Sequence, residues 1–311
     1  MRHLTLKQLR AFAETVRHGS ITGAAQALNV TPPAISLQLK LLEEMAGLPL
    51  LIRDEKGFRP TDAGQVVVET AQRVEAVMRD GGEALRSLRG GVHGTVHVGV
   101  VSTAKYFAPR ALAAFRSLHP EIELKLSVGN RDETVAALRN YDLDFAVMGR
   151  PPKDFAVEQE QIGPHPHVVI ARPDHPLARE AEVSLEMLAH ETFLVREAAS
   201  GTRALTDQLL ARMARGPVIG MEISSNETIK QAVMAGLGVA LISAHTVANE
   251  VNEGKLGIIQ AEGLPIVRMW YVVRRADRPL LPATRALWRY FVEEVGAMLP
   301  QISGMSLSDE L

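Results

Sequence analysis

The sequence of 311 residues contains no cysteine. This absence excludes disulfide bonds, thiol nucleophiles and zinc sites built from cysteine. Long apolar runs are also missing, because none approaches the roughly 18 residues that a membrane helix needs. The first residues, MRHLTLKQLRAF, are amphipathic and lack the charged-then-apolar order of a signal peptide. We therefore expect a cytoplasmic protein with no membrane association.

Net charge is low, at −2, but it is distributed unevenly along the chain. Residues 1–60 carry eight Lys or Arg against five Asp or Glu, whereas the remaining 251 residues carry a net charge of −5. The basic excess at the N-terminus favours a nucleic-acid-binding segment. Hydrophobic residues form 46% of the chain and charged residues 23%, which is typical of globular protein. A chain of this length is expected to form two or three domains.

Residues 1–61 have the pattern of a winged helix-turn-helix. Apolar residues recur at spacings of three and four over residues 5–17, which predicts an amphipathic helix. Ser20 and Thr31 can N-cap two further helices, and two prolines suit the first turn of the third helix. Two short extended pieces within residues 47–61 flank a turn and predict a wing. In this fold the third helix enters the major groove of DNA.

A long helix is predicted over residues 62–90, followed by a glycine-rich hinge at residues 91–95. At about 28 residues the helix would span roughly 40 Å, which is more than a small domain can cover. Its apolar residues alternate spacings of four and three, as in a coiled coil. We therefore expect it to pair with a second copy of the chain, the alternative being that the stripe packs against its own domain. The candidate dimerisation residues are Val67, Ala71, Val74, Met78, Leu85 and Leu88.

Beyond Thr95, segments of strand and helix character alternate, which predicts a parallel sheet covered by helices. The first series runs over residues 96–148, and a second, similar series runs over residues 168–242. This repetition predicts an α/β region of two lobes. The last residues, 301–311, are polar and acidic, and we expect them to form a flexible tail.

Each lobe has a segment rich in hydroxyl and cationic groups just before a helix, VSTAK at 101–105 and SGTR at 200–203. Free amides at helix N-termini bind anions, and such side chains assist them. If the lobes face each other, both segments and nearby arginines line one cleft that favours anions. Ordinary N-caps and surface ion pairs are the alternative. The candidate effector-binding residues are Ser102, Thr103, Ala104, Lys105, Arg131, Arg150, Arg196, Ser200, Gly201, Thr202 and Arg203.

The segment LKQLRAFAETVRHGSITGAAQALNVTPPAISLQLKLLEEMAGLPLLIR, with PTDAG at 60–64, resembles the N-terminal region of LysR-type transcriptional regulators. The resemblance implies that the start of the third helix approaches DNA bases and that neighbouring residues hold phosphates. Pro32 and Leu37 depart from the pattern, since many members carry Gln and a polar or basic residue there. The implied base-reading residues are Pro32, Pro33, Ser36 and Gln38, and the implied backbone-contacting residues are Ser20, Thr31, Lys40 and Arg53.

The same resemblance implies a C-terminal effector domain with the two-lobed fold of type 2 periplasmic binding proteins. It assigns residues 96–161 and 267–300 to lobe I and residues 162–266 to lobe II. It places inducers between the lobes, on residues matching Ser102, Thr103, Thr202 and Asn226.

Residues 102–152 further resemble the subgroup that regulates carbon-dioxide-fixation operons, those of the Calvin cycle and RuBisCO. The implied effectors are phosphorylated sugars such as ribulose bisphosphate, phosphoenolpyruvate, NADPH or ATP. A carboxylate effector and another metabolic operon are the open alternatives. Dimers would associate into a tetramer that bends operator DNA. Effector binding would close the lobes, change the bend and so control the recruitment of RNA polymerase.

An enzyme is the main alternative, since two α/β lobes around a cleft also form catalytic sites. His165 and His167 alternate near a strand start but have no carboxylate at ligand spacing, so no metal is expected. Ser243 and His245 lack the GxSxG elbow of a nucleophile, and we expect neither a cofactor nor enzymatic activity. An exported solute-binding protein would share the two lobes, but it would need a signal peptide and would leave residues 1–90 unexplained.

Overall fold

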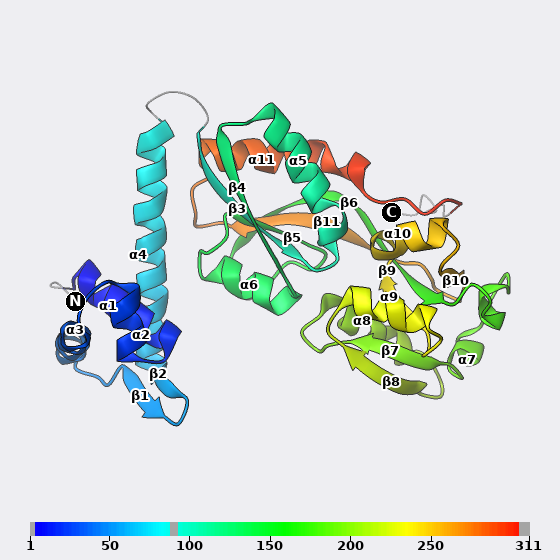
Figure 1. Ribbon diagram of the computed structural model, residues 1–311, viewed down its shortest axis with the longest axis horizontal. Helices are drawn as coiled ribbons and strands as arrows, with labels where there is room; N and C mark the ends of the chain where they lie inside the picture. Colours follow the sequence, from blue (N-terminus) through cyan, green and yellow to red (C-terminus); the bar gives the residue numbers. More distant parts are fainter. Residues whose placement is uncertain (1–3, 88–92, 305–311) are drawn as a thin grey trace. The chain divides into compact units, whose positions relative to one another are not determined.

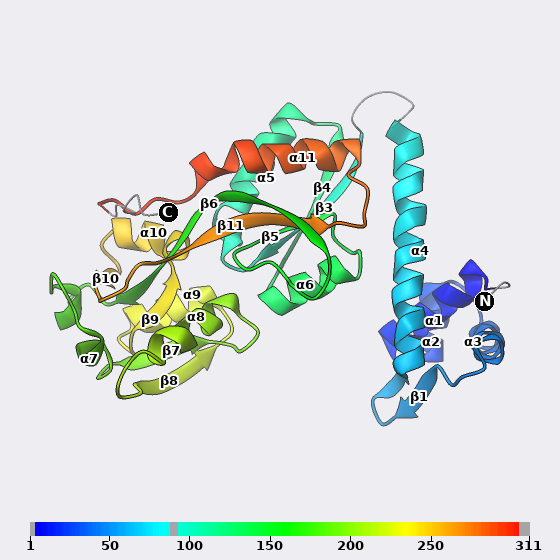
Figure 2. The ribbon, with the colours of Figure 1, turned by 180° about the vertical axis from the view of Figure 1, so that it is seen from behind.

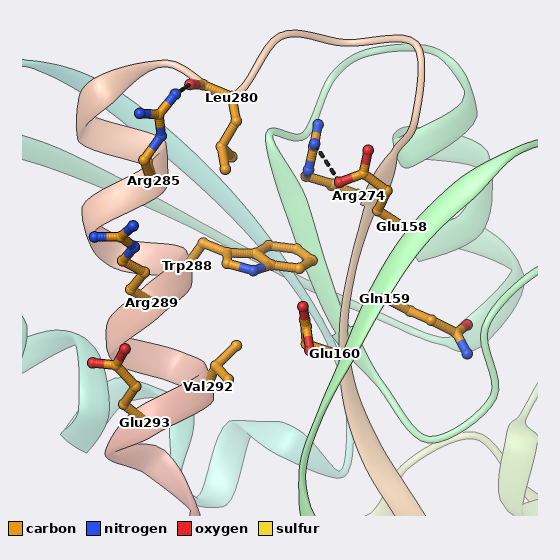
Figure 3. Close-up of a pocket in the computed structure, with 10 residues that line it drawn as sticks. All are labelled: Glu158, Gln159, Glu160, Arg274, Leu280, Arg285, Trp288, Arg289, Val292 and Glu293. Carbon is orange, nitrogen blue, oxygen red and sulfur yellow. Dashed lines mark hydrogen bonds and ion pairs between the residues drawn. The ribbon is translucent and has the colours of Figure 1, made fainter.

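The structure is a computed structural model that describes residues 4–87 and 93–304. The chain divides into two compact units, residues 1–89 and residues 90–311 (Figures 1 and 2). Among the helices within the described ranges, none combines the length and the apolar character needed to cross a bilayer.

The N-terminal unit is a helical domain with a two-stranded wing. The first helix begins at Leu6 with Thr5 as its N-cap, and Ser20 N-caps the second helix as predicted. Thr31 occupies the N-cap of the third helix, whose first turn begins with the two prolines. Strands β1 and β2 pair in antiparallel register and confirm the wing. The elements are α1 (Leu6–His18), α2 (Ile21–Ala27), α3 (Pro32–Ala46), β1 (Leu51–Asp54), β2 (Gly57–Pro60) and α4 (Asp62–Ser87).

The first half of α4 packs against α1 and belongs to the core of its own domain. Val67 and Ala71 are buried there, so the prediction that they contact a second copy is wrong for these two residues. The sequence pattern of α4 is continuous, but α1 covers only its beginning. Met78 and Leu85 lie beyond this cover and are 58% and 68% exposed. Leu88 lies outside the described residues.

The C-terminal unit contains a seven-stranded sheet and a separate two-stranded sheet. The strands are β3 (Gly94–Val101), β4 (Ile122–Gly129), β5 (Phe145–Met148), β6 (Val157–Ala171), β7 (Thr192–Arg196), β8 (Val218–Ile223), β9 (Ala240–Ser243), β10 (Gly257–Ile259) and β11 (Ile266–Arg275). The helices are η1 (Ala104–Tyr106), α5 (Ala108–Leu118), α6 (Arg131–Arg139), η2 (Pro176–Ala178), α7 (Leu185–Leu188), α8 (Gly201–Leu210), α9 (Asn226–Met234), α10 (Ala244–Asn252), α11 (Pro282–Glu293) and η3 (Val295–Met298).

Lobe I is built on the part of the large sheet in which β3 pairs in parallel with both β4 and β5. Strand β11 pairs in antiparallel direction with β5 and with β6. The predicted parallel sheet is therefore correct for β3, β4 and β5. It is wrong for β6, which pairs in antiparallel direction with β9, β10 and β11. Helices α5 and α11 lie over one face of this sheet and α6 over the other (Figures 1 and 2).

Strands β6 and β11 join the two lobes. They pair from Val157 opposite Arg275 to His167 opposite Ile266. Ile162 on β6 packs in the core of lobe I, whereas Val168 on the same strand packs in the core of lobe II. Side chains on this crossing are therefore held at the junction of the lobes.

The beginning of the predicted flexible tail is docked on lobe II. Ile302 is buried in the core cluster that includes α9 and α10. The side chain of Asn252 donates to the carbonyl of Gln301 (3.0 Å) and accepts from the backbone amide of Ser303 (2.9 Å). The prediction of a flexible tail is wrong for residues 301–303, because one apolar side chain in the polar segment reaches a core. Residues 305–311 lie outside the described ranges.

Candidate functional site

The turn between α2 and α3 fixes the position of α3. The hydroxyl of Ser20 accepts from the backbone amide of Gly23 (3.0 Å) at the start of α2. After α2, Asn29 adopts φ 53°, a left-handed conformation that asparagine tolerates better than most residues. The amide of Val30 then donates to the carbonyl of Ala25 (3.0 Å), which closes the turn. This geometry places α3 across α2 with one face free.

The free face of α3 carries most of the predicted DNA contacts. Ile35, Leu39 and Leu42 point into the core, whereas Thr31, Pro32, Pro33, Ser36 and Lys40 are exposed and Gln38 is half-buried. Thr31 makes no side-chain capping bond, so its hydroxyl is not used by the helix. Ser36 donates to the carbonyl of Pro32 (3.2 Å), and Lys40 lies 3.7 Å from the carboxylate of Glu44.

The wing adds exposed cations beside this face. Arg53 lies on β1 and its guanidinium carbon is 5.6 Å from the centre of the Phe58 ring. This ring contact holds the arginine side chain while its charge stays exposed to solvent. Arg59 on β2 is paired with Asp54 at 3.2 Å. Arg53 is therefore better suited than Arg59 to hold a phosphate.

A small cavity of about 40 Å³ lies between the two lobes of the C-terminal unit. We call it the interlobe cavity. Of the predicted effector-binding residues, Thr103, Arg131, Arg150, Gly201 and Thr202 line it. Val101 from the VSTAK segment lines it too. Five further residues that the sequence reasoning did not assign to it complete the lining, namely Met148, Gly149, His165, His167 and Arg268.

The helix starts at the VSTAK and SGTR segments differ slightly from the expected geometry. A single 3-10 turn, η1, separates β3 from α5. Ala104 in this turn is buried in the lobe I core, so its side chain does not face the interlobe cavity. In lobe II the hydroxyl of Ser200 accepts from the amide of Thr202 (3.2 Å) and so acts as the N-cap of α8. The side chain of Lys105 lies over the Tyr106 ring. Neither Lys105 nor Ser200 lines the interlobe cavity.

Arg196 and Asn226 are used within the protein. Arg196 is 1% exposed, and its Nε and Nη2 atoms each donate to Glu197 at 2.8 Å. Its Nη1 atom donates to the side chain of Asn226 and lies 3.5 Å from the hydroxyl of Ser102. Arg196 therefore uses its donors within the protein and does not line the interlobe cavity. The Nδ2 atom of Asn226 is buried without a hydrogen-bond partner in the described residues, so an effector contact at Asn226 stays a prediction. Ser102 likewise contacts Arg196 across the lobes instead of lining the cavity.

Arg203 also points away from the cavity. Its guanidinium donates to Asp207 (2.9 Å), to Glu222 (2.7 Å) and to the carbonyl of Arg196 (2.9 Å). The prediction of an effector contact is therefore corrected for Arg203, whose charge is neutralised by two carboxylates. The sequence motif showed the cation but could not show these partners.

Two arginines of the interlobe cavity lack counter-ions. Within the described part of the chain, neither Arg150 nor Arg268 forms an ion pair with an acidic side chain. Burial lowers the pKa of Arg268, and the charge of Arg150 lowers it further. Arg131 donates through Nε to the backbone carbonyl of Arg150 (3.2 Å), which orients that segment. The cavity therefore carries uncompensated positive charge.

The histidines of the cavity are neutral. Burial lowers the pKa of His167 to about 3, and the charge of Arg268 contributes to the shift. Burial also lowers the pKa of His165 well below its usual value. His165 Nε2 lies 3.0 Å from the hydroxyl of Ser243, and its Nδ1 atom is buried without a hydrogen-bond partner in the described residues. Neutral imidazoles beside two guanidinium groups form a polar site for an anion.

Residues 6–65 match the family model for bacterial regulatory helix-turn-helix proteins of the lysR family. Residues 89–296 match the model for the LysR substrate binding domain, which is more than half of the chain. The chain belongs to the LysR family of transcriptional regulators. The expectation of a regulator in place of an enzyme is therefore confirmed.

This LysR-family regulator is 48% identical over 304 residues to the HTH-type transcriptional regulator CbbR of Xanthobacter flavus, a match that covers 97% of this chain and 91% of that protein. It is 40% identical over 296 residues to the RuBisCO operon transcriptional regulator of Allochromatium vinosum, with 95% and 98% covered. The solved regulatory domain of CcmR from Synechocystis PCC6803, in complex with 2-PG, is 34% identical with a TM-score of 0.62. That match covers 64% of this chain and 96% of the domain.

Three polar residues of the interlobe cavity in this LysR-family regulator were missed for one reason. His165 and His167 lie on β6 and Arg268 lies on β11, the two strands that cross between the lobes. The alternation of His165 and His167 was visible in the sequence and places both on one face of a strand. Their pairing partner β11 is about 100 residues away in the chain, so the local pattern gave no sign of which cavity they face.

Proposed function

We propose that this LysR-family protein regulates carbon-dioxide-fixation genes and that a small phosphorylated metabolite in the interlobe cavity modulates its operator binding. The names of the relatives from Xanthobacter flavus and Allochromatium vinosum support the first part. The observation that carries the second part is the pair Arg150 and Arg268, two cations without carboxylate partners in the described residues. A phosphate monoester carries a charge of about −1.5 to −2 near neutral pH and matches two guanidinium groups.

The size of the cavity favours a small effector. Its volume of about 40 Å³ is far below the roughly 300–1,000 Å³ typical of ligand pockets. Phosphoenolpyruvate or the 2-PG of the Synechocystis domain needs less opening of the lobes than ribulose bisphosphate, NADPH or ATP. Thr103 and Thr202 supply hydroxyl donors from opposite lobes, so a bound anion would hold the lobes together. This link between occupancy and lobe position is the proposed regulatory step.

On the DNA side, we assign base contacts to the exposed face of α3 and phosphate contacts to Thr31, Lys40 and Arg53. The domain assignment is residues 1–61 for DNA binding, 62–90 for dimerisation and 91–95 for the hinge. The exposed apolar residues of α4, Val66, Val77, Met78 and Leu85, form the proposed dimer surface. Two dimers then make a tetramer that bends the operator and contacts RNA polymerase.

A gel-shift experiment tests DNA recognition. The full-length protein is mixed with the promoter fragment of a carbon-dioxide-fixation operon from its own genome and with random duplex DNA, at two salt concentrations. We expect tight binding of the promoter and weak binding of random DNA that falls steeply with salt. Equal affinity for both fragments would contradict the proposed regulatory target.

Isothermal titration tests the effector class. The ligands are 2-PG, phosphoenolpyruvate, ribulose bisphosphate, NADPH, ATP and a monocarboxylate such as acetate. We expect the two small phosphorylated acids to bind more tightly than the larger ligands and the monocarboxylate. Binding of acetate with no binding of any phosphorylated ligand would overturn the proposal of a phosphorylated effector and favour the carboxylate alternative.

A further inference from the structure

A second and larger cavity lies at the junction of the lobes and shares no lining residue with the interlobe cavity. We call it the lateral cavity. Its volume is about 490 Å³, within the range of roughly 300–1,000 Å³ that ligand pockets occupy. Tyr106 and Arg110 come from lobe I, Lys230 comes from α9, and His245, Thr246 and Asn249 come from α10. Helix α10 lies beside the end of the chain that returns from lobe I (Figure 1).

One cation of the lateral cavity is unpaired. Lys230 is buried but binds two carboxylates, Glu250 at 2.6 Å and Glu227 at 2.8 Å, so its charge is neutralised. Arg110 is exposed and has no acidic partner within the described residues. The hydroxyl of Tyr106 is not an acid here, because burial raises the pKa of Tyr106 to about 12. Arg110 is therefore a cation of this lining that is free to pair with a ligand.

His245 lines this cavity and holds its imidazole proton on a defined nitrogen. Its Nδ1 atom accepts a hydrogen bond from the indole nitrogen of Trp270 (3.0 Å). Burial lowers the pKa of His245 to about 4, so the ring is neutral at physiological pH. A neutral imidazole that accepts at Nδ1 carries its proton on Nε2. The Nε2 hydrogen is therefore a fixed donor on a residue that lines the cavity.

Thr246 adds an unexplained polar group. It is 2% exposed, and its hydroxyl is buried without a hydrogen-bond partner in the described residues. Burying an unsatisfied hydroxyl costs about 1–3 kcal/mol, and such groups in folded proteins usually serve a ligand or a water molecule. Residues 297–300 and Ala248 form an apolar part of the lining, and Glu250, the partner of Lys230, and Gln301 complete it.

We propose that the lateral cavity binds a small organic acid with a single carboxylate and a short apolar body. The carboxylate pairs with Arg110 and accepts hydrogen bonds from His245 and Thr246, and the body packs on residues 297–300. This site is separate from the interlobe cavity and does not depend on the proposed function. Its chemistry differs too, since it offers one unpaired cation and an apolar wall in place of two arginines.

Trp270 connects the two cavities and can report on the lateral one. Its ring stacks on His165, which lines the interlobe cavity, with ring centres 3.7 Å apart and planes inclined by 15°. Its indole nitrogen binds His245, which lines the lateral cavity. A ligand that contacts His245 changes the environment of Trp270. The chain has two tryptophans, so the variant Trp288→Phe leaves Trp270 as the sole indole fluorophore.

The test titrates the full-length Trp288→Phe protein with butyrate and hexanoate and records indole emission. We expect a saturable change with a dissociation constant of roughly millimolar size, as befits ligands of so few atoms. Butylamine, which carries the opposite charge, should give no saturable change. If Trp288→Phe does not fold, isothermal titration of the unmodified chain with the same acids replaces the emission measurement.

Three variants decide where the acid binds. Arg110→Gln, at an exposed position, should weaken binding about tenfold or more. Thr246→Val should weaken binding and raise the melting temperature, because it removes the unpaired hydroxyl. Arg268→Met, in the interlobe cavity, should leave the affinity for butyrate and hexanoate unchanged. No saturable response to either acid up to about 100 mM would overturn the proposal. A response that Arg268→Met abolishes and Arg110→Gln leaves intact would also overturn it.

Discussion

Replacing Arg268 by methionine is expected to weaken the binding of a small phosphorylated acid by about 10- to 150-fold. Arg268 lines the interlobe cavity and has no carboxylate partner in the described residues. A hydrogen bond to a charged group contributes about 1.5–3 kcal/mol, and about 1.4 kcal/mol corresponds to a tenfold change in affinity. Methionine keeps an unbranched apolar stem of similar length, so the substitution removes charge and donors with little loss of packing.

The same substitution is expected to stabilise the unliganded protein, although it weakens ligand binding. The lowered pKa of Arg268, caused by burial and then by Arg150, means that its charged form is disfavoured in the empty cavity. Arg268→Met is therefore expected to raise the melting temperature without ligand while it lowers the affinity for ligand. A residue with a purely structural role would lower both.

Isothermal titration with 2-PG and thermal denaturation measure the two effects. Arg203→Met is the matched control, because Arg203 is paired with Asp207 and Glu222 and does not line the cavity. It should leave the affinity for 2-PG unchanged. The reasoning is refuted if Arg268→Met binds 2-PG as tightly as the unmodified protein, or if Arg203→Met weakens binding as strongly as Arg268→Met.

Three further predictions concern dimerisation, pH and DNA. Met78→Glu should shift the protein toward monomers in sedimentation analysis, whereas Gln65→Glu, which adds the same charge on the opposite side of α4, should not. The pKa of His245 is lowered from 6.5 to about 4, so the unfolded chain binds a proton before the folded chain does as the pH falls. This residue should therefore reduce the free energy of unfolding by about 3 kcal/mol between pH 6.5 and pH 4. A free energy of unfolding that stays constant over this range in chemical denaturation would contradict the burial of His245. Arg53→Ala should weaken all duplexes similarly, and Ser36→Ala should reduce the preference for the operator by about 1–3 kcal/mol in competition gel shifts; the reverse pattern would exchange their roles.

The N-terminal unit could be predicted closely because its signals are local. The Ser20 cap and the apolar periodicity of α1 act within a few residues, and the structure confirms the helices that they predict. The error in α4 arose at longer range. Its apolar stripe reads as one seam, but Val67 and Ala71 face α1, which lies about 55 residues earlier in the chain.

The interlobe cavity was predictable only in part. Thr103 and Thr202 were found because hydroxyls before a helix are a local pattern, and both line the cavity. Arg196 and Arg203 also lie near a helix start, but their guanidinium groups donate hydrogen bonds to the carboxylates of Glu197 and Glu222. Sequence patterns do not show these partners. Arg268 was missed because its position depends on the antiparallel return of β11 beside β6.

The most direct test of the account is the affinity of the full-length protein for its own carbon-dioxide-fixation promoter, measured by fluorescence anisotropy with and without saturating 2-PG or phosphoenolpyruvate. We expect at least one of these small phosphorylated acids to change the promoter affinity of the unmodified protein. In Arg268→Met the same change should need about 10- to 150-fold more of that acid. Identical promoter affinity with and without both acids would contradict the claim that a small phosphorylated acid between the lobes controls DNA binding.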